Sequence, residues 1–218
     1  MRGQGDGQIA TQTRLSHRAR QQQIVDAARE LIASGGADAL TVRAVADRVG
    51  VTEAAIYRHV TSKDEVLLLL INDVHDSLFS ALRKSTSEGG SALEKLNHLL
   101  ELHLSYVELR RGISFMVIAE AAQFQEPRVR AAGKNLVEEY LKHVQGLITE
   151  GQRQGEIAST VNAAAAATTF FGMIQAAVTK WLFDASAHPL TENAGAMWAL
   201  FSSALGSPAE GSNGRKGG

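Results

Sequence analysis

The stretch TVRAVADRVGVTEAAIYRHVTSK, residues 41–63, decides how this 218-residue chain is interpreted. Four apolar residues near its start recur at the i, i+3, i+4 and i+7 spacing of one helix face: Val42, Val45, Ala46 and Val49. Gly50 follows the last of them, and glycine readily takes the left-handed conformation that ends a helix. The pattern predicts a short helix that begins after the N-cap residue Thr41 and ends in a tight turn.

A second short helix is predicted directly after this turn. Thr52 is a favourable N-cap, and Ile56 is the bulky apolar residue that can anchor the helix to a core. Polar, aromatic and basic residues remain for its outer face and its exit: Glu53, Ala54, Tyr57, Arg58, His59 and Lys63. The two helices predict a helix-turn-helix, which places its second helix in the major groove of DNA. An ordinary helical hairpin has the same spacing, but Tyr, Arg and Lys side chains are typical of phosphate contacts.

The same region resembles the TetR/AcrR family of one-component transcriptional regulators. The runs LTVRAVADRVGV, residues 40–51, and AAIYRHVTSKDEVL, residues 54–67, carry the resemblance. It spans residues 18–67, and beyond them only chain length and helix content are similar. The resemblance implies an all-α protein of about nine helices, in which a DNA-binding head precedes a helical body that dimerises and binds a ligand.

The resemblance also implies a role for each residue of the motif. Thr41 would bond a phosphate, and Arg43 would reach a phosphate or a guanine edge. Glu53 and Ala54 occupy positions that usually face bases, although Glu53 alternatively complements the positive end of its own helix. The side chains expected on the phosphate backbone are Tyr57, His59 and Lys63, with Arg58 either joining them or staying solvated. The predicted DNA-binding set is Thr41, Arg43, Thr52, Glu53, Ala54, Tyr57, Arg58, His59 and Lys63.

Composition and charge agree with a helical, DNA-binding protein. The chain is 44% hydrophobic and 21% charged, with only three prolines, which is typical of a globular protein rich in helix. It has no cysteine, so disulfides, thiol catalysis and cysteine metal sites are excluded. Residues 14–63 carry three more basic than acidic side chains, and residues 64–218 carry four more acidic than basic ones. This asymmetry favours a basic head on an acidic body.

Helix start and stop signals divide the chain into four parts. Residues 1–16 are predicted to be a disordered arm, which either contacts DNA or remains a solvated tail. Residues 17–62 form the helix-turn-helix domain, and residues 63–205 form the regulatory and dimerisation domain. Residues 206–218 are predicted to be a flexible tail. A long helix that begins at Lys63 is expected to link the two domains.

A helix predicted from Ala163 to Ala185 has more apolar positions than one core-facing side can use. A two-fold dimer would present two reading helices to a palindrome. This helix and the last one, predicted from about Thr191 to Leu205, are the candidates for the dimer contact. The alternative is a helix buried within one subunit. The predicted interface residues, including one from the last helix, are Ala163, Ala167, Phe171, Ile174, Val178, Trp181, Leu182 and Trp198.

The resemblance implies an effector pocket in the body. Its candidate residues are apolar or aromatic, and they equally fit a plain core: Phe79, Phe115, Met116, Ala119, Phe124, Tyr140 and Phe170. Such a lining favours an unidentified small apolar or amphipathic effector, to which a histidine could add a polar contact: His75, His98, His103 or His143. No metal site is expected, because no His-x-x-x-His pair is present.

The predicted function is a ligand-responsive transcriptional repressor that binds a palindromic operator as a homodimer. Effector binding would tilt the long fourth helix, so that the two heads no longer match successive grooves. The alternative is a DNA-bound interaction protein of the nucleoid-occlusion type, because the string EAAIYRH, residues 53–59, is similar to the reading helix of those members.

Other classes of protein lack support in the sequence. No enzyme activity and no cofactor are expected, because no phosphate-binding glycine loop, nucleophile elbow or zinc motif is present. No signal peptide is expected, because the N-terminus is rich in Gly, Gln and Thr and has no apolar core. No membrane span is expected either, since the most apolar stretch, residues 163–183, is rich in alanine and contains several polar residues. The expected location is therefore the cytoplasm, in association with the nucleoid.

Overall fold

The structure, a computed structural model, describes residues 17–87, 89–184 and 187–206. These residues form nine α-helices and one 3-10 helix, with no strand among them: α1 His17–Gly35, η1 Ala37–Ala39, α2 Val42–Val49, α3 Glu53–Ile56, α4 Lys63–Ser87, α5 Ala92–Leu109, α6 Ile113–Gln123, α7 Pro127–Gln154, α8 Ala163–Phe183 and α9 Ala194–Ala204. The predicted all-α class is confirmed. The predicted arm, and all of the predicted tail except Gly206, lie outside the described residues.

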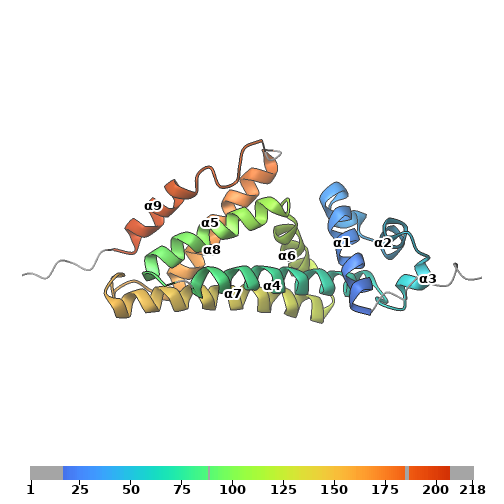
Figure 1. The fold of residues 1–218 in the computed structure, drawn as a ribbon, viewed down its shortest axis with the longest axis horizontal. Coiled ribbons are helices and arrows are strands. Elements are labelled where there is room, and N and C mark those ends of the chain that lie inside the picture. Colours follow the sequence, from blue (N-terminus) through green and yellow to red (C-terminus); the bar gives the residue numbers. More distant parts are fainter. Residues whose placement is uncertain (1–16, 88, 185–186, 207–218) are drawn as a thin grey trace, which may run out of the picture.

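The molecule is elongated, with its two parts at opposite ends. Figure 1 shows α1, α2 and α3 grouped at one end, and we call this part, residues 17–62, the head. The remaining helices, residues 63–205, form the body, in which α4 runs beside α7 along most of the length. Because α4 begins at the head and continues into the body, it joins the two parts without a flexible linker.

The head forms from local signals that the sequence displays. The Oγ1 atoms of Thr41 and Thr52 accept hydrogen bonds from the backbone N–H groups of Ala44 and Ala55, at 3.0 Å and 3.3 Å. The turn between α2 and α3 contains Gly50 with φ 75°, a conformation that costs glycine little. The head core is completely apolar and includes Ile24, Ala28, Leu40, Val45, Ala46, Ile56 and Val60.

The reading helix is shorter than the sequence predicts. We expected it to extend through His59, but α3 ends at Ile56. The N–H of His59 donates to the carbonyl oxygen of Ile56 at 2.8 Å, and such an i→i+3 bond tightens the chain into a turn. Tyr57, Arg58 and His59 therefore lie on this turn rather than on the helix.

The start of α4 is fixed by two hydrogen bonds. The N–H of Glu65 donates to Ser62 Oγ at 3.3 Å, and the Glu65 carboxylate accepts from the N–H of Thr61 at 2.6 Å. Ser62 and Glu65 therefore cap the helix together, but the carboxylate reaches one residue further back than a capping box requires. Beyond this cap, α4 buries Val66, Leu67, Leu70 and Ile71, so that head and body share one continuous apolar core.

Candidate DNA-binding surface and regulatory body

The predicted DNA-contacting side chains gather on α2, α3 and the turn that follows. Seven of the nine are exposed: Thr41, Arg43, Thr52, Glu53, Ala54, Tyr57 and Arg58. His59 and Lys63 are half-buried. Tyr57 is 48% exposed despite its aromatic ring, and neither Arg43 nor Arg58 makes an ion pair with another described residue. The surface therefore presents unpaired cations beside an exposed aromatic ring.

The two threonines have hydrogen-bonding capacity to spare. Their oxygen atoms act as acceptors in capping α2 and α3. A hydroxyl group is also a donor, so Thr41 and Thr52 can each cap a helix and still donate to a phosphate oxygen. Structural capping and phosphate contact are compatible in these residues.

The surroundings of His59 disfavour its protonated form. Its ring lies 4.9 Å from the ring of His17, and its Nδ1 atom is buried with no hydrogen-bond partner among the described residues. Burial lowers the pKa of His59, and the neighbouring His17, Arg20 and Arg58 lower it further. A phosphate placed against this ring would offset that effect, because an opposite charge favours the protonated form.

Lys63 contacts both parts of the molecule. Its Nζ donates to the carbonyl oxygen of Ala37, in η1, at 3.0 Å. The same ammonium group lies 5.7 Å from the ring centroid of Phe124, at the end of α6. The sequence predicted only a phosphate contact for Lys63, since neither η1 nor a neighbour 61 residues along the chain leaves a periodic signal.

The predicted pocket residues divide into a core set and a surface set. Phe79, Tyr140 and Phe170 are buried, and the Phe170 ring packs edge-on against Phe201 at 5.2 Å between centroids. Their positions favour the plain-core alternative for these three residues. The four candidates on or beside α6 are half-buried or exposed: Phe115, Met116, Ala119 and Phe124.

A groove between α6 and α7 offers a different candidate ligand site. Its volume is about 500 Å³, and its lining is Ile118, Ala122, Arg130, Ala131, Gly133, Lys134, Val137 and Glu138. Below the groove the helices approach closely, since a Cβ added to Gly133 would lie 3.0 Å from the Cβ of Ala121. Sequence analysis missed this site. The strongly apolar composition of α6, which exceeds what one core face needs, was the available signal.

The four candidate histidines have distinct environments. His103 is buried, and its Nδ1 lies 2.8 Å from the hydroxyl of Tyr140. Burial lowers the pKa of His103 to about 4 and raises the pKa of Tyr140, because burial disfavours the charged form of each group. His75 bridges to Glu139 at 2.9 Å, and this hydrogen bond raises its pKa. His98 is exposed, while burial lowers the pKa of the half-buried His143.

The predicted dimer residues lie mostly on the inner side of α8. Ala167, Ile174 and Val178 are fully buried within the subunit, because this face packs against α7. These three residues therefore belong to the subunit core and leave the interface set. The other five are half-buried: Ala163, Phe171, Trp181, Leu182 and Trp198. The outward face of α8 carries small residues over most of its length, namely Ala164, Ala165, Thr168, Thr169, Gly172 and Ala176, and ends in the exposed Lys180 and Phe183.

The described residues contain neither a metal-binding cluster nor a helix able to span a membrane. No group of three or more His, Asp or Glu side chains is arranged to hold a metal ion within residues 17–87, 89–184 and 187–206. Over the same ranges, no helix combines the length and the apolar character needed to cross a bilayer.

Comparison with known proteins agrees with this geometry. Residues 24–70 match the family described as "Bacterial regulatory proteins, tetR family", and residues 72–204 match "YsiA-like protein, C-terminal region". The nucleoid occlusion factor SlmA of Aliivibrio fischeri is 26% identical over 187 residues, covering 85% of this chain and 95% of that protein. The fatty acid metabolism regulator protein of Bacillus subtilis is 27% identical over 162 residues, covering 74% and 83%.

Solved structures have the same architecture. The transcriptional regulator FadR of Bacillus subtilis, in complex with stearoyl-CoA, superimposes with a TM-score of 0.76 at 25% identity, covering 85% of this chain and 99% of that one. AibR, in complex with isovaleryl coenzyme A and operator DNA, superimposes with a TM-score of 0.69 at 18% identity, covering 83% and 97%. The exposed helix-turn-helix surface, the helical body and the two family matches lead to one conclusion: the chain belongs to the TetR family and is a DNA-binding transcriptional regulator.

Proposed function

We propose that the protein is a ligand-responsive transcriptional repressor that binds a palindromic operator as a homodimer. The observation that carries the proposal is the exposed reading surface, where Tyr57 is 48% exposed beside the unpaired cations Arg43 and Arg58. An exposed tyrosine hydroxyl and exposed guanidinium groups can donate hydrogen bonds to a second molecule. Phosphate and base-edge contacts would use both.

Dimerisation would supply the second reading helix. One helix-turn-helix contacts a single half-site, and a two-fold pair reads two half-sites a helical turn apart. The small residues on the outer face of α8, such as Gly172 and Ala176, allow a partner helix to approach closely. Gly172→Arg would place a long charged side chain on this face, and we expect a monomer by light scattering. Gly146→Arg, on the exposed side of α7, is the matched control.

The groove between α6 and α7 is the proposed effector site. Ile118, Ala122 and Val137 supply apolar surface, while Arg130 and Lys134 supply positive charge. Glu138, which also lines the groove, lies 3.4 Å from the Lys134 ammonium group and offsets part of this charge. Its volume of about 500 Å³ lies within the usual range for small-molecule sites. This lining suits an amphipathic anion with a hydrocarbon part. Acyl thioesters of coenzyme A have this chemistry, and the similar regulator of Bacillus subtilis was solved with stearoyl-CoA.

A chain of contacts connects this groove to the head. α6, which forms one wall of the groove, ends at Gln123, and the ring of the next residue, Phe124, lies under the ammonium group of Lys63. Lys63 in turn bonds to Ala37 in the head. A ligand that separated α6 from α7 would displace Phe124, and the position of the head would change with it.

The test combines operator selection with effector titration. Selection from random duplex DNA should recover a palindrome, and palmitoyl-CoA should release the protein from it in an anisotropy assay. Coenzyme A alone should release it weakly, because it lacks the hydrocarbon chain. The double substitution Arg130→Glu and Lys134→Glu should keep operator affinity and lose the response. Selection without a palindrome, or a complex that no acyl-CoA weakens, would count against the proposal.

The nucleoid-occlusion alternative remains, because SlmA proteins match this chain as well as the fatty acid regulator does. SlmA of Vibrio atlanticus is 27% identical over 194 residues, covering 88% of this chain. Mapping of chromosomal binding sites separates the two functions. A repressor should occupy a few promoters and leave them when palmitoyl-CoA is added. Many sites spread over the chromosome, none of which respond to the thioester, would favour the alternative.

A further inference from the structure

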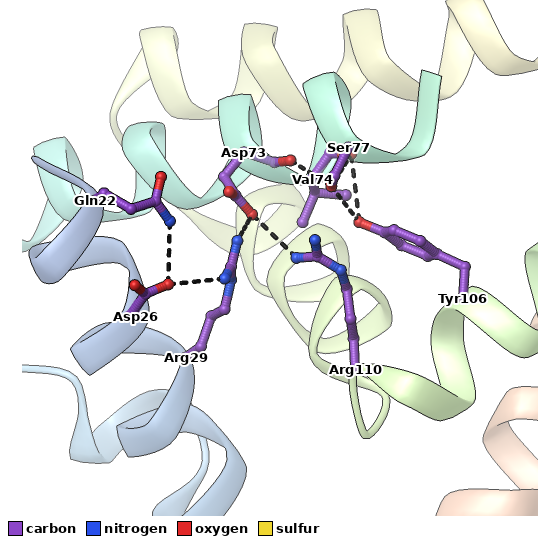
Figure 2. Close-up of polar contacts among 8 residues, drawn as sticks. All are labelled: Gln22, Asp26, Arg29, Asp73, Val74, Ser77, Tyr106 and Arg110. Atoms are coloured by element: carbon purple, nitrogen blue, oxygen red, sulfur yellow. Dashed lines mark hydrogen bonds and ion pairs between the residues drawn. The ribbon is translucent and has the colours of Figure 1, made fainter. Parts of the chain in front are cut away.

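One carboxylate oxygen joins the head to the body. Figure 2 shows Asp73 of α4 between Arg29, which comes from α1 in the head, and Arg110, at the end of α5 in the body. The Nη2 atom of Arg29 and the Nη1 atom of Arg110 both contact Asp73 Oδ2, the latter at 3.1 Å. Three helices therefore meet at one atom.

The charges of this cluster interact strongly because the three side chains are partly buried. The side chains of Arg29, Asp73 and Arg110 are only 21%, 18% and 23% exposed. Charges at such partly buried sites are screened less than charges on the open surface. The two guanidinium groups would repel each other without the carboxylate between them, so Asp73 is what allows head and body to approach here.

Contacts within each part of the molecule hold the two arginines of this cluster. The guanidinium of Arg110 lies 4.8 Å from the ring centroid of Tyr106, and the Tyr106 hydroxyl lies 2.7 Å from the Ser77 hydroxyl on α4. These contacts fix Arg110 relative to Asp73 (Figure 2). From the head, Arg29 is the residue that reaches Asp73. Its other ion pair, to Asp26 at 2.9 Å, stays within α1, where Asp26 also accepts a hydrogen bond from Gln22 (Figure 2). The Arg29–Asp73 contact is therefore a charged link between head and body, beside the apolar packing of α1 against α4.

We propose that Asp73 is a positioning residue that sets the angle between the DNA-binding head and the body. It lies about 15 Å along α4 from Lys63 and so takes no part in the reading surface. The proposal rests on the proposed function, because the head angle matters for binding only where two heads must reach two half-sites. A single head on a single half-site is indifferent to it.

The DNA-binding test compares a palindrome with an isolated half-site. Asp73→Asn should weaken palindrome binding about tenfold, a loss of roughly 1.4 kcal/mol, and should leave half-site binding unchanged. It should also reduce the preference for one half-site spacing. Glu150→Gln is the matched control, because the Lys95–Glu150 pair is similarly buried, at 16% and 26% exposure, but lies wholly in the body between α5 and α7. It should bind both DNAs as the parent protein does.

A distance measurement tests the head angle without DNA. The chain has no cysteine, so Asp47→Cys in α2 and Gln145→Cys in α7, both exposed, can carry two spin labels. Dilution with unlabelled chain makes the measured distance intramolecular in any oligomer. Double electron–electron resonance should give a narrow distance distribution for the parent, and Asp73→Asn should broaden it. Glu150→Gln should leave it narrow.

A second variant guards against failure to fold. Arg29→Gln keeps the Arg110–Asp73 pair and removes the contact with the head, and it should reproduce both effects. The proposal is overturned if these variants leave the distance distribution unchanged, or if they weaken half-site and palindrome binding equally. If the parent protein prefers no palindrome, the proposed function fails, while the distance measurement still decides the role of Asp73.

Discussion

The ammonium group of Lys63 lies 3.0 Å from the carbonyl oxygen of Ala37, and this bond ties the first residue of α4 to the 3-10 helix of the head. A lysine has three N–H donors. Lys63 can therefore keep the bond to Ala37 and still donate to a phosphate at the edge of the reading surface.

Lys63→Gln should weaken binding to all DNA sequences alike. If the ammonium group neutralises one phosphate, the slope of log affinity against log salt concentration should fall by about 1. Fluorescence anisotropy at several salt concentrations measures both quantities. Lys142→Gln, on the exposed side of α7, should change neither. An unchanged salt slope would restrict Lys63 to its contacts with Ala37 and Phe124.

Arg43→Ala should relax the base preference of the operator as well as weaken binding. A guanidinium that reaches a guanine edge contributes about 1–3 kcal/mol of discrimination. The affinity of the variant can be measured for a set of operators, each with one base pair changed. At the base pair that Arg43 contacts, changing the base should no longer alter the affinity. Arg58→Ala is the comparison, and it should lower all affinities by the same factor. The same uniform loss for Arg43→Ala would assign this residue to a phosphate.

His103 should make the folded protein sensitive to acid. Burial lowers the pKa of His103 to about 4, against 6.5 for a free histidine. The folded state therefore binds a proton at His103 less readily than the unfolded state does. The free energy of unfolding is at its full value above pH 6.5 and decreases as the pH falls toward 4. The loss at pH 5 should be about 2 kcal/mol. Urea unfolding of the parent and of His103→Gln should show a smaller pH dependence in the variant. Equal pH dependence would exclude His103 as the cause.

Gly50→Ala should destabilise the head by about 1 kcal/mol. The φ of 75° at Gly50 strains any residue with a Cβ, although an added Cβ would meet no atom within 4 Å. The cost is therefore conformational rather than steric, and Gly50→Val should cost more. Gly146→Ala is the control, since this glycine lies inside α7 with equal space around it. It should stabilise the protein, because alanine favours helix. Thermal unfolding measures all three.

The reading surface could be predicted from the sequence because its determinants are local. Thr41, Gly50 and Thr52 act within a few residues of their own position, as caps or as a turn. Ile56 is the bulky apolar residue of its helix, so its burial fixes which side chains point outward. The family resemblance of the same residues then indicated the function.

The arrangement of the body could not be predicted in the same way. Periodicity correctly placed Ala167, Ile174 and Val178 on one face of α8, but it could not tell whether α7 or a second subunit covers that face. The answer depends on contacts between residues far apart in sequence. The Arg29–Asp73–Arg110 cluster and the groove between α6 and α7 depend on such contacts too, and neither leaves a pattern in any single segment.

The unbroken course of α4 makes it a lever. Its 25 residues span roughly 37 Å, with the head at one end and the body core along the rest. A rotation of about 10° around the far end would move the head by roughly 6 Å, which is nearly two base-pair steps of 3.4 Å. A small change in packing deep in the body is therefore enough to misalign the reading helix with its groove.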